Sequence, residues 1–254
     1  MKQTHVNRCV LKPQKGDVIE IVPLGDLHKG SPTFNEKKAI ETRDYCVKNN
    51  IYVIGMGDYI ECGTKTSVGD GVYSQTSDPQ TQLEWMIEFF RPLSDKGLLL
   101  GLHTGNHCLR VRKESGIDVV ATMCMILKVP YLGYTCYHHI RVGKQGYTVW
   151  STHGYSSARL PHTKLNAAIK ASSHATVDLV LYAHTHGLEA TASLNEKIDG
   201  RNRTITTNGK HIVLTGSFLE YRGSYAEMLG LPPVKTGVAK IMLRSDRHDV
   251  HVSV

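Results

Sequence analysis

The sequence predicts an α/β fold, and three observations support this prediction. Short apolar runs typical of buried strands alternate along the chain with segments whose apolar residues recur every three to four positions, as in helices. Several of these runs are followed by glycine together with Asp, Asn or His. The chain has 254 residues and no Pro-rich, Ser-rich or low-complexity linker, so we expect one domain over residues 1–254.

The predicted strand at residues 51–54 is the centre of this interpretation. Its Ile-Tyr-Val-Ile sequence suits a strand buried on both faces, and Gly55 and Gly57 end it just before Asp58. Ligands of open α/β sheets bind at the carboxyl ends of the strands. Gly57 also removes a side chain that would keep an ion away from the backbone. Because a carboxylate has two oxygens, we expect Asp58 to bridge two cations.

The segment before it predicts a neighbouring strand end. Residues 17–24 form the first predicted core strand and lead into Asp26 and His28. If the backbone there is extended, side chains two positions apart leave on the same side and can bind one ion. Residues 35–49 have helical spacing, and together with the strands on either side they predict a right-handed βαβ unit. Asp26, His28 and Asp58 should therefore lie on adjacent strand ends.

The middle of the chain predicts a third strand end. Residues 98–102 are apolar and lead to Asn106 and His107. The polar stretch at residues 62–80 is too long for a tight turn, and loops of that size beside a site often act as lids or substrate walls. Helices are predicted over residues 81–93 and 118–127.

The second half supplies further histidines. Residues 140–142 and 147–152 predict a hairpin that leads to His153, and a strand over residues 177–182 leads to His184 and His186. A helix is expected around residues 167–171 and a surface hairpin over residues 196–209. The closing runs are expected to form a second sheet stacked on the first, over residues 211–215, 239–243 and 250–254.

Composition limits the setting of the protein. The six cysteines are scattered without a CxxC pair, and polar residues follow Met1, so we expect a reducing cytoplasm. No apolar run approaches the roughly 18 residues of a membrane span, which excludes a membrane protein of that kind. The formal net charge is +7, and residues 128–254 hold the whole positive excess. This charge favours an anionic partner, although a merely basic surface explains it equally well.

Each polar cluster has an ordinary explanation when taken alone, because an Asp after Gly often belongs to a turn. Five clusters together favour a site for metal ions. They supply a mixed set of nitrogen and oxygen donors that suits Mn, Fe, Zn or Ni, namely Asp26, His28, Asp58, Asn106, His153, His184 and His186.

The clusters resemble the motif blocks of calcineurin-like metallophosphoesterases, in the same order. That pattern is D-x-H, GD, GNH, H and GHxH. The matching segments span residues 25–187 and are Asp26-Leu27-His28, Gly57-Asp58, Gly105-Asn106-His107, His153-Gly154 and Ala183-His184-Thr185-His186. The resemblance implies a four-layer α-β-β-α sandwich of two mixed sheets, with the site at the sheet edge.

The resemblance also implies which residues bind each metal ion and which residue acts as the general acid. One divalent ion would take Asp26, His28, Asp58 and His186, and the second would take Asp58, Asn106, His153 and His184. A hydroxide between the ions, with Mn the favoured metal, would attack phosphorus. His107 would protonate the leaving oxygen as the catalytic residue.

Two departures from the family pattern stand out. Cys108 occupies the position of an acidic residue that usually orients the preceding histidine. Cys62 replaces the phosphate-binding Arg of protein Ser/Thr phosphatases, which argues against that activity. Candidates for holding substrate phosphate are Arg110, Arg112, Arg159 and Arg222, with His162 as the best candidate among the histidines outside the blocks.

We therefore expect a dinuclear-metal phosphoesterase with a phosphate-ester substrate. The leading prediction is a phosphodiesterase on nucleic acid or nucleotides, similar to the nuclease branch of the family. The alternatives are a phosphomonoesterase on a small metabolite or nucleotide, and a scaffold that keeps the metal site without turnover.

Overall fold

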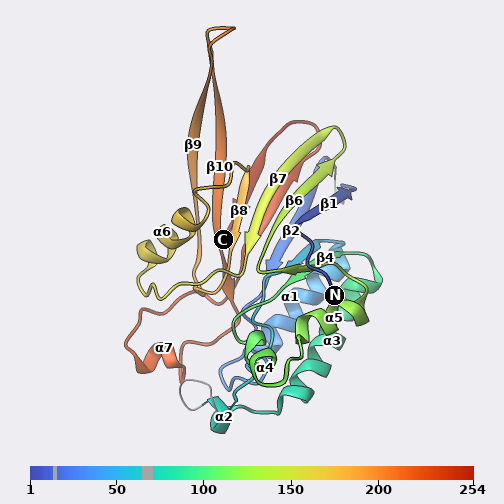
Figure 1. Cartoon of the computed structure of the whole chain (residues 1–254), viewed down its shortest axis with the longest axis vertical. Coiled ribbons are helices and arrows are strands. Elements are labelled where there is room, and N and C mark those ends of the chain that lie inside the picture. The colour runs from blue at the N-terminus through green and yellow to red at the C-terminus, as the bar shows by residue number, and fades with distance from the viewer. Residues whose placement is uncertain (14–15, 65–70) are drawn as a thin grey trace.

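Two mixed β-sheets pack face to face, with helices on their outer sides (Figure 1). The computed structural model describes residues 1–13, 16–64 and 71–254. The expected lid or wall at residues 62–80 falls partly outside these ranges. The four-layer α/β architecture predicted through the family resemblance is confirmed by the two sheets and their helices.

The first sheet has six strands in the order β13-β12-β2-β3-β4-β5. Strands β2 to β5 are parallel to their neighbours, whereas β12 and β13 join antiparallel. The parallel strands bring their carboxyl ends to one edge of the sheet. The bounds are β2 Val18–Leu24, β3 Tyr52–Gly55, β4 Leu99–His103, β5 Tyr131–Gly133, β12 Lys240–Arg244 and β13 Val250–Ser253.

The second sheet has the order β1-β6-β7-β8-β10-β11, and β9 pairs with β10 outside this path. It mixes parallel pairs such as β7 and β8 with antiparallel pairs such as β6 and β7. The bounds are β1 Val6–Leu11, β6 Thr135–Val142, β7 Gln145–Thr152, β8 Leu179–Tyr182, β9 Leu188–Asp199, β10 Thr204–Ser217 and β11 Gly237–Val238.

Helices cover both outer faces. α1, α3 and α5 pack against the first sheet, and α6 packs against the second, with Ala168 beside Trp150 and Ile212. None of the helices in the described ranges combines the length and the apolar character that a membrane crossing requires. The bounds are α1 Glu36–Asn49, α2 Gly71–Ser74, α3 Pro79–Asp95, α4 Cys108–Ser115, α5 Val119–Leu127, α6 Pro161–Ala171 and α7 Tyr225–Met228.

The main apolar core lies between the sheets. Ile21 and Ile54 of the first sheet pack in one buried cluster with Val149 and Leu181 of the second. β8 is buried along its whole length because both of its faces are covered, whereas burial alternates along β6 because its outer face is exposed. The core thus fixes the sheets against each other and sets where their strand ends meet.

Part of the predicted strand assignment is wrong. The runs that form β12 and β13 were expected in the second sheet, but β12 pairs with β2, and Ile241 lies opposite Ile21. Only the run within β10 belongs to the second sheet. Strand β1, which pairs in parallel with β6, was not predicted from the sequence. Apolar spacing identifies a strand, whereas its partner depends on how the whole chain packs.

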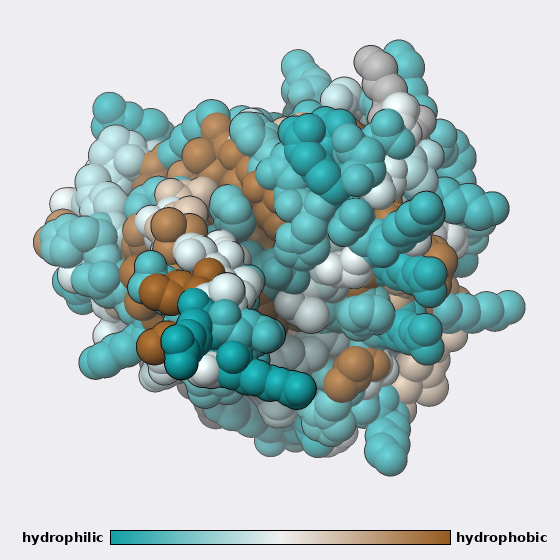
Figure 2. Space-filling view, turned by 90° about the horizontal axis from the view of Figure 1, so that it is seen from above, coloured by the Kyte–Doolittle hydropathy of each residue, from teal (hydrophilic) through white to brown (hydrophobic). Residues whose placement is uncertain are grey.

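The predicted surface hairpin is present and longer than expected. Strands β9 and β10 project from the body as a two-stranded arm (Figure 1). Their pairing begins with Leu188 opposite Thr215 and ends with Asp199 opposite Thr204. Figure 2 looks along this arm and shows a mostly hydrophilic surface with scattered apolar patches. Ile198 and Ile205 are directly opposite each other and exposed, as is Leu194 on the same face.

Candidate metal centre

The seven predicted ligands come from five segments that meet at one place. Each segment follows a strand that the sheets hold at the same edge, so residues far apart in sequence become neighbours. Asp26 and His28 follow β2, Asp58 follows β3, Asn106 follows β4, His153 follows β7, and His184 and His186 follow β8.

The donor atoms form three overlapping groups, each with its atoms within 4.8 Å of one another. The first is Asp26, His28 and His186, and the second is Asp58, His153 and His184. A third group joins these two and consists of His28, Asp58 and His107. Asn106 joins the second group, because its Oδ1 lies 3.1 Å from His153 Nε2. The division between two ions that the family resemblance implies therefore has a geometric counterpart, while the role of each residue as a ligand stays a prediction.

The backbone at these residues is not extended. Asp26, His28 and Asp58 have φ of 47°, 52° and 46°, and His184 and His186 have 65° and 55°. The premise that side chains two apart meet because the chain is extended is therefore wrong. Left-handed backbone is unfavourable for residues other than glycine, and such strain gathers at functional sites. Here it turns the side chains of each pair toward the site.

Hydrogen bonds outside the centre orient two of the imidazoles. His153 Nδ1 lies 2.9 Å from the carbonyl oxygen of Met56, which leaves its Nε2 facing Asp58 Oδ2 at 3.2 Å. His184 Nε2 lies 3.1 Å from the carbonyl oxygen of Ser156, which leaves its Nδ1 for the second group. A ligand histidine whose other nitrogen donates to a carbonyl is the usual arrangement in metal sites.

Two glycines allow this close packing. A Cβ at Gly105 would lie 2.1 Å from Asp58 Oδ1, and a Cβ at Gly57 would lie 2.8 Å from His153 Nδ1. The space that the sequence assigned to an ion beside Gly57 is thus occupied by the ring of His153. Both positions require glycine because a side chain would displace a predicted ligand.

The centre carries strong negative potential. Burial lowers the pKa of His28, but Asp26 and Glu61 outweigh it and raise the value to about 10. For His153, burial is likewise outweighed by Asp58, and the pKa is raised to about 9. Burial alone would raise the pKa of Asp58, yet the neighbouring histidines hold it well below its ordinary value. The buried carboxylates thus favour any positive charge placed among them.

The donor set fits a divalent cation. Asp26 Oδ1 is fully buried without a hydrogen-bond partner. It lies 3.5 Å from His186 Nε2 and 3.8 Å from His28 Nε2, and these two nitrogens face each other at 3.3 Å. An unpartnered buried carboxylate oxygen is costly unless a cation or proton satisfies it. Mixed carboxylate and imidazole donors suit transition metals of the Mn to Zn series.

His107 lies at the edge of the centre. It is the N-cap residue of α4 and has right-handed helical backbone, with φ −67° and ψ −44°. Its ring packs edge to face against the ring of His28, with 4.4 Å between the ring centroids. Its backbone N–H donates to Asp58 Oδ1 at 2.8 Å. His107 therefore contacts two predicted ligands, Asp58 and His28.

Glu61 is a residue of the candidate site that the sequence interpretation missed. Its Oε2 lies 3.0 Å from His28 Nδ1 and its Oε1 lies 3.3 Å from His107 Nδ1. Burial opposes its charge, but these two histidines hold the pKa of Glu61 below its ordinary value. The available signal was its position three residues after Asp58.

Among the candidate arginines, Arg110 reaches the centre. Its Nη2 donates to His107 Nε2 at 3.1 Å, and its Nη1 lies 3.3 Å from Glu61 Oε1. Arg222 instead pairs with Glu227 on the surface. Arg159 and His162 are exposed.

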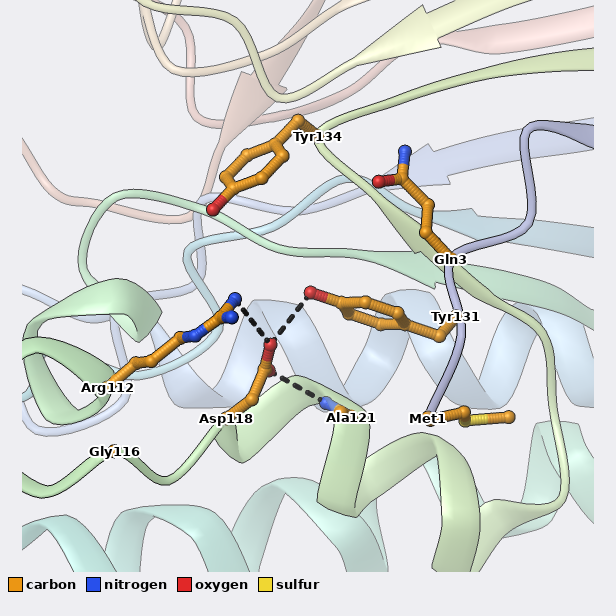
Figure 3. Close-up of a pocket in the computed structure, with 8 residues that line it drawn as sticks. All are labelled: Met1, Gln3, Arg112, Gly116, Asp118, Ala121, Tyr131 and Tyr134. Atoms are coloured by element: carbon orange, nitrogen blue, oxygen red, sulfur yellow. Dashed lines mark hydrogen bonds and ion pairs between the residues drawn. The ribbon is translucent and has the colours of Figure 1, made fainter.

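Arg112 belongs to a separate pocket of about 410 Å³. Figure 3 shows its guanidinium turned toward Asp118, at 3.4 Å, with the Tyr131 hydroxyl donating to the same carboxylate at 2.8 Å. Asp118 also caps α5 by accepting from the backbone N–H of Ala121. Asp118 therefore offsets the charge of Arg112 in this pocket.

The fold is shared with solved structures at low identity. A predicted phosphoesterase from Streptococcus pneumoniae is 14% identical (TM-score 0.39; 93% of this chain and 94% of that chain covered). Vacuolar protein sorting 29 from Cryptosporidium parvum is 15% identical (0.43; 94% and 98%). A metallophosphoesterase from Sphaerobacter thermophilus is 10% identical (0.43; 93% and 87%). No protein-family model and no curated protein matches the sequence.

Proposed function

We propose that this protein is a divalent-metal-dependent phosphoesterase of the calcineurin-like kind. The observation that carries the proposal is the meeting of five motif segments at one place. Two groups of three donors have their atoms within 4.8 Å of one another, and Asn106 Oδ1 lies 3.1 Å from His153 Nε2. The orphaned, buried Asp26 Oδ1 supports a cation at the first group.

The chain offers four donors for each ion. Asp26, His28, Asp58 and His186 would hold the first ion, and Asp58, Asn106, His153 and His184 the second. When bound, two divalent ions activate water and offset the charge of a phosphate group. Mn is our first choice, with Fe, Zn and Ni as alternatives, because the donors mix carboxylate, amide and imidazole.

His107 is the residue that we propose as the general acid. In the structure its Nε2 accepts from Arg110, so its proton lies on Nδ1, toward Glu61. Proton delivery from Nε2 therefore requires that Arg110 turns away, and a substrate phosphate is a natural new partner for that guanidinium. Glu61 would stabilise the protonated imidazole.

We expect a phosphodiester to be the better substrate. A monoester carries nearly two negative charges at pH 7 and is best held by an unpaired guanidinium. Cys62 stands where protein phosphatases have such an arginine and is buried. Arg110 is near, but Glu61 offsets its charge. The basic second half of the chain supports a nucleotide or nucleic acid as the anionic partner.

The test compares bis(4-nitrophenyl) phosphate with 4-nitrophenyl phosphate, each with added Mn²⁺. We expect a larger kcat/KM for the diester. A monoester preference of about tenfold, roughly 1.4 kcal/mol in transition-state binding, would replace this proposal by a phosphomonoesterase. Activity on a polynucleotide should fall as salt rises. If neither substrate is hydrolysed with Mn, Fe, Zn or Ni, the phosphoesterase proposal would be replaced by a scaffold that binds metal without turnover.

The cellular setting is part of the proposal. All six cysteines are free and buried, which suits a reducing compartment such as the cytoplasm.

A further inference from the structure

A second pocket adjoins the metal centre. It has a volume of about 500 Å³, within the roughly 300–1,000 Å³ range of small-ligand sites, and Asn106 and His153 form part of its wall. Two predicted ligands thus face both the centre and this pocket. A group attached to a phosphate held at the centre would extend into it.

The rest of this wall is rich in aromatic rings. Tyr134, Trp150, Tyr155 and Tyr182 all contribute. Tyr134 and Tyr155 are exposed, at 52% and 86%, whereas Trp150 and Tyr182 are buried. The exposed rings of Tyr134 and Tyr155 are thus accessible to an incoming ring, beside an apolar wall that includes Trp150 and Tyr182.

Tyr155 is held in place despite its exposure. The buried Tyr182 hydroxyl accepts from the Tyr155 backbone N–H at 3.1 Å and donates to its carbonyl oxygen at 3.0 Å. The Tyr155 ring lies nearly parallel to His184, at an interplanar angle of 18° and a centroid distance of 5.9 Å. One face of the Tyr155 ring is therefore directed at a predicted ligand, and the backbone that carries the ring is held next to the centre.

We propose that this pocket binds the nucleobase of a nucleoside phosphate ester. The proposal rests on the proposed function, because it places the phosphate at the metal centre and the base on Tyr155 and Tyr134. Stacking on tyrosine suits any base, since each has a π face. The exposed Thr135 at the rim offers a hydroxyl for base edges, whereas a saturated alkyl group would gain neither contact.

Binding can be followed without turnover. The chain has two tryptophans, and Trp150 lines the pocket. In a Trp85→Phe background, adenosine 5′-monophosphate should quench Trp150 fluorescence, and ribose 5-phosphate should not. Tyr155→Leu should raise the dissociation constant about tenfold, whereas Tyr155→Phe keeps the ring and the affinity. The control is Tyr45→Ala. Tyr45 lies on the outer helix α1 and is as exposed as Tyr134, and its replacement should leave the dissociation constant unchanged.

Turnover gives the second measurement. Thymidine 5′-(4-nitrophenyl) phosphate and methyl 4-nitrophenyl phosphate share one leaving group and differ only in the other substituent. We expect a kcat/KM at least tenfold larger for the nucleoside ester, and Tyr155→Leu should remove the difference while the metal content stays constant.

The outcomes separate the two proposals. Equal turnover of both diesters, with equal binding of the two monophosphates, would overturn the base pocket and leave the phosphoesterase standing. Base-dependent quenching without turnover by any metal would support the pocket and remove the phosphoesterase. Quenching that survives Tyr155→Leu at full affinity would also overturn the pocket.

Discussion

Glu61 links two neighbouring histidines of the candidate metal centre. It contacts His28 and His107 through different carboxylate oxygens. Cys108, at the position where an acidic residue was expected, is buried, and burial raises the pKa of its thiol to about 12. Because a neutral thiol supplies no negative charge, Glu61 is the group that can orient and charge His107.

Glu61→Gln should lower kcat and the metal affinity by about 10- to 100-fold, the usual effect of losing a charged partner behind a ligand. The amide keeps a similar shape but holds no charge beside His28 and His107. Steady-state kinetics and metal titration measure the two effects. Glu88→Gln, an exposed carboxylate on α3, is the matched control. Unchanged kcat and metal affinity in Glu61→Gln would contradict a role for Glu61 in the site.

His107→Asn should retain both metals and slow turnover by about 10²- to 10⁴-fold, the usual contribution of a general acid. The loss should be smaller for 4-nitrophenolate, a weak base that leaves without a proton, than for an alkoxide. Rates with esters of graded leaving-group pKa provide the measurement. A loss that is independent of the leaving group would contradict the acid role.

Asp58→Asn should weaken metal binding in both groups of donors. Its two oxygens face different neighbours, the His107 backbone N–H and His153 Nε2, and an amide cannot bridge two cations as a carboxylate does. Metal analysis of the purified variant should find less than one ion per chain. Retention of one full equivalent would show that Asp58 serves a single ion.

At the scale of elements, the strand ends build the centre and the projecting arm lies outside it. Residues 204–209 of β10 are exposed, whereas the strand becomes buried from Lys210 onward. The Lys210 ammonium donates to the carbonyl oxygens of Ser172 and Ala175, which ties the buried part of β10 to the end of α6. The outer half of the arm thus adds little to the core.

Replacing residues 195–208 by Asn-Gly should leave the fold and the metal centre intact. Leu194 and Gly209 are opposite each other, so a two-residue turn can close the shortened hairpin. The melting temperature should change by less than about 4 °C, as expected for a change below 1 kcal/mol in a chain of this size. Metal content should equal that of the full chain. A large drop in either would assign the arm a structural role.

At the scale of the whole molecule, a buried polar network joins the two sheets. Ser151 Oγ of β7 lies 2.7 Å from His103 Nε2 of β4 and 2.6 Å from His138 Nε2 of β6. Asn7 of β1 lies 3.4 Å from His138 Nδ1 and donates to the carbonyl oxygen of Leu100. Burial lowers the pKa of His103 to about 3 and that of His138 to about 4, so both are neutral in the folded protein near pH 7.

This network predicts a loss of stability in acid. Between about pH 6.5 and pH 4, the unfolded chain binds protons at these histidines and the folded chain does not, so the free energy of unfolding falls as pH falls. Each histidine adds a slope of up to about 1.4 kcal/mol per pH unit. His138→Gln should reduce the slope measured by urea unfolding at several pH values, and His174→Gln is the control. An unchanged slope would contradict the assignment.

The sequence by itself predicted many of the strands and the residue types of the candidate site. Apolar runs that end in glycine and polar donors predicted β2, β3, β4 and β8, and the five motif blocks predicted seven donors that the fold brings together. These features are local, because burial on both faces and donor chemistry are set by residue type.

The tertiary structure decided what depends on neighbours distant in the chain. Strand pairing placed β12 beside β2, left-handed backbone turned Asp26 and His28 into the centre, and Glu61 reached both His28 and His107. Pairing, backbone strain and contacts across the site are each stabilised by residues elsewhere in the fold, so no local pattern records them.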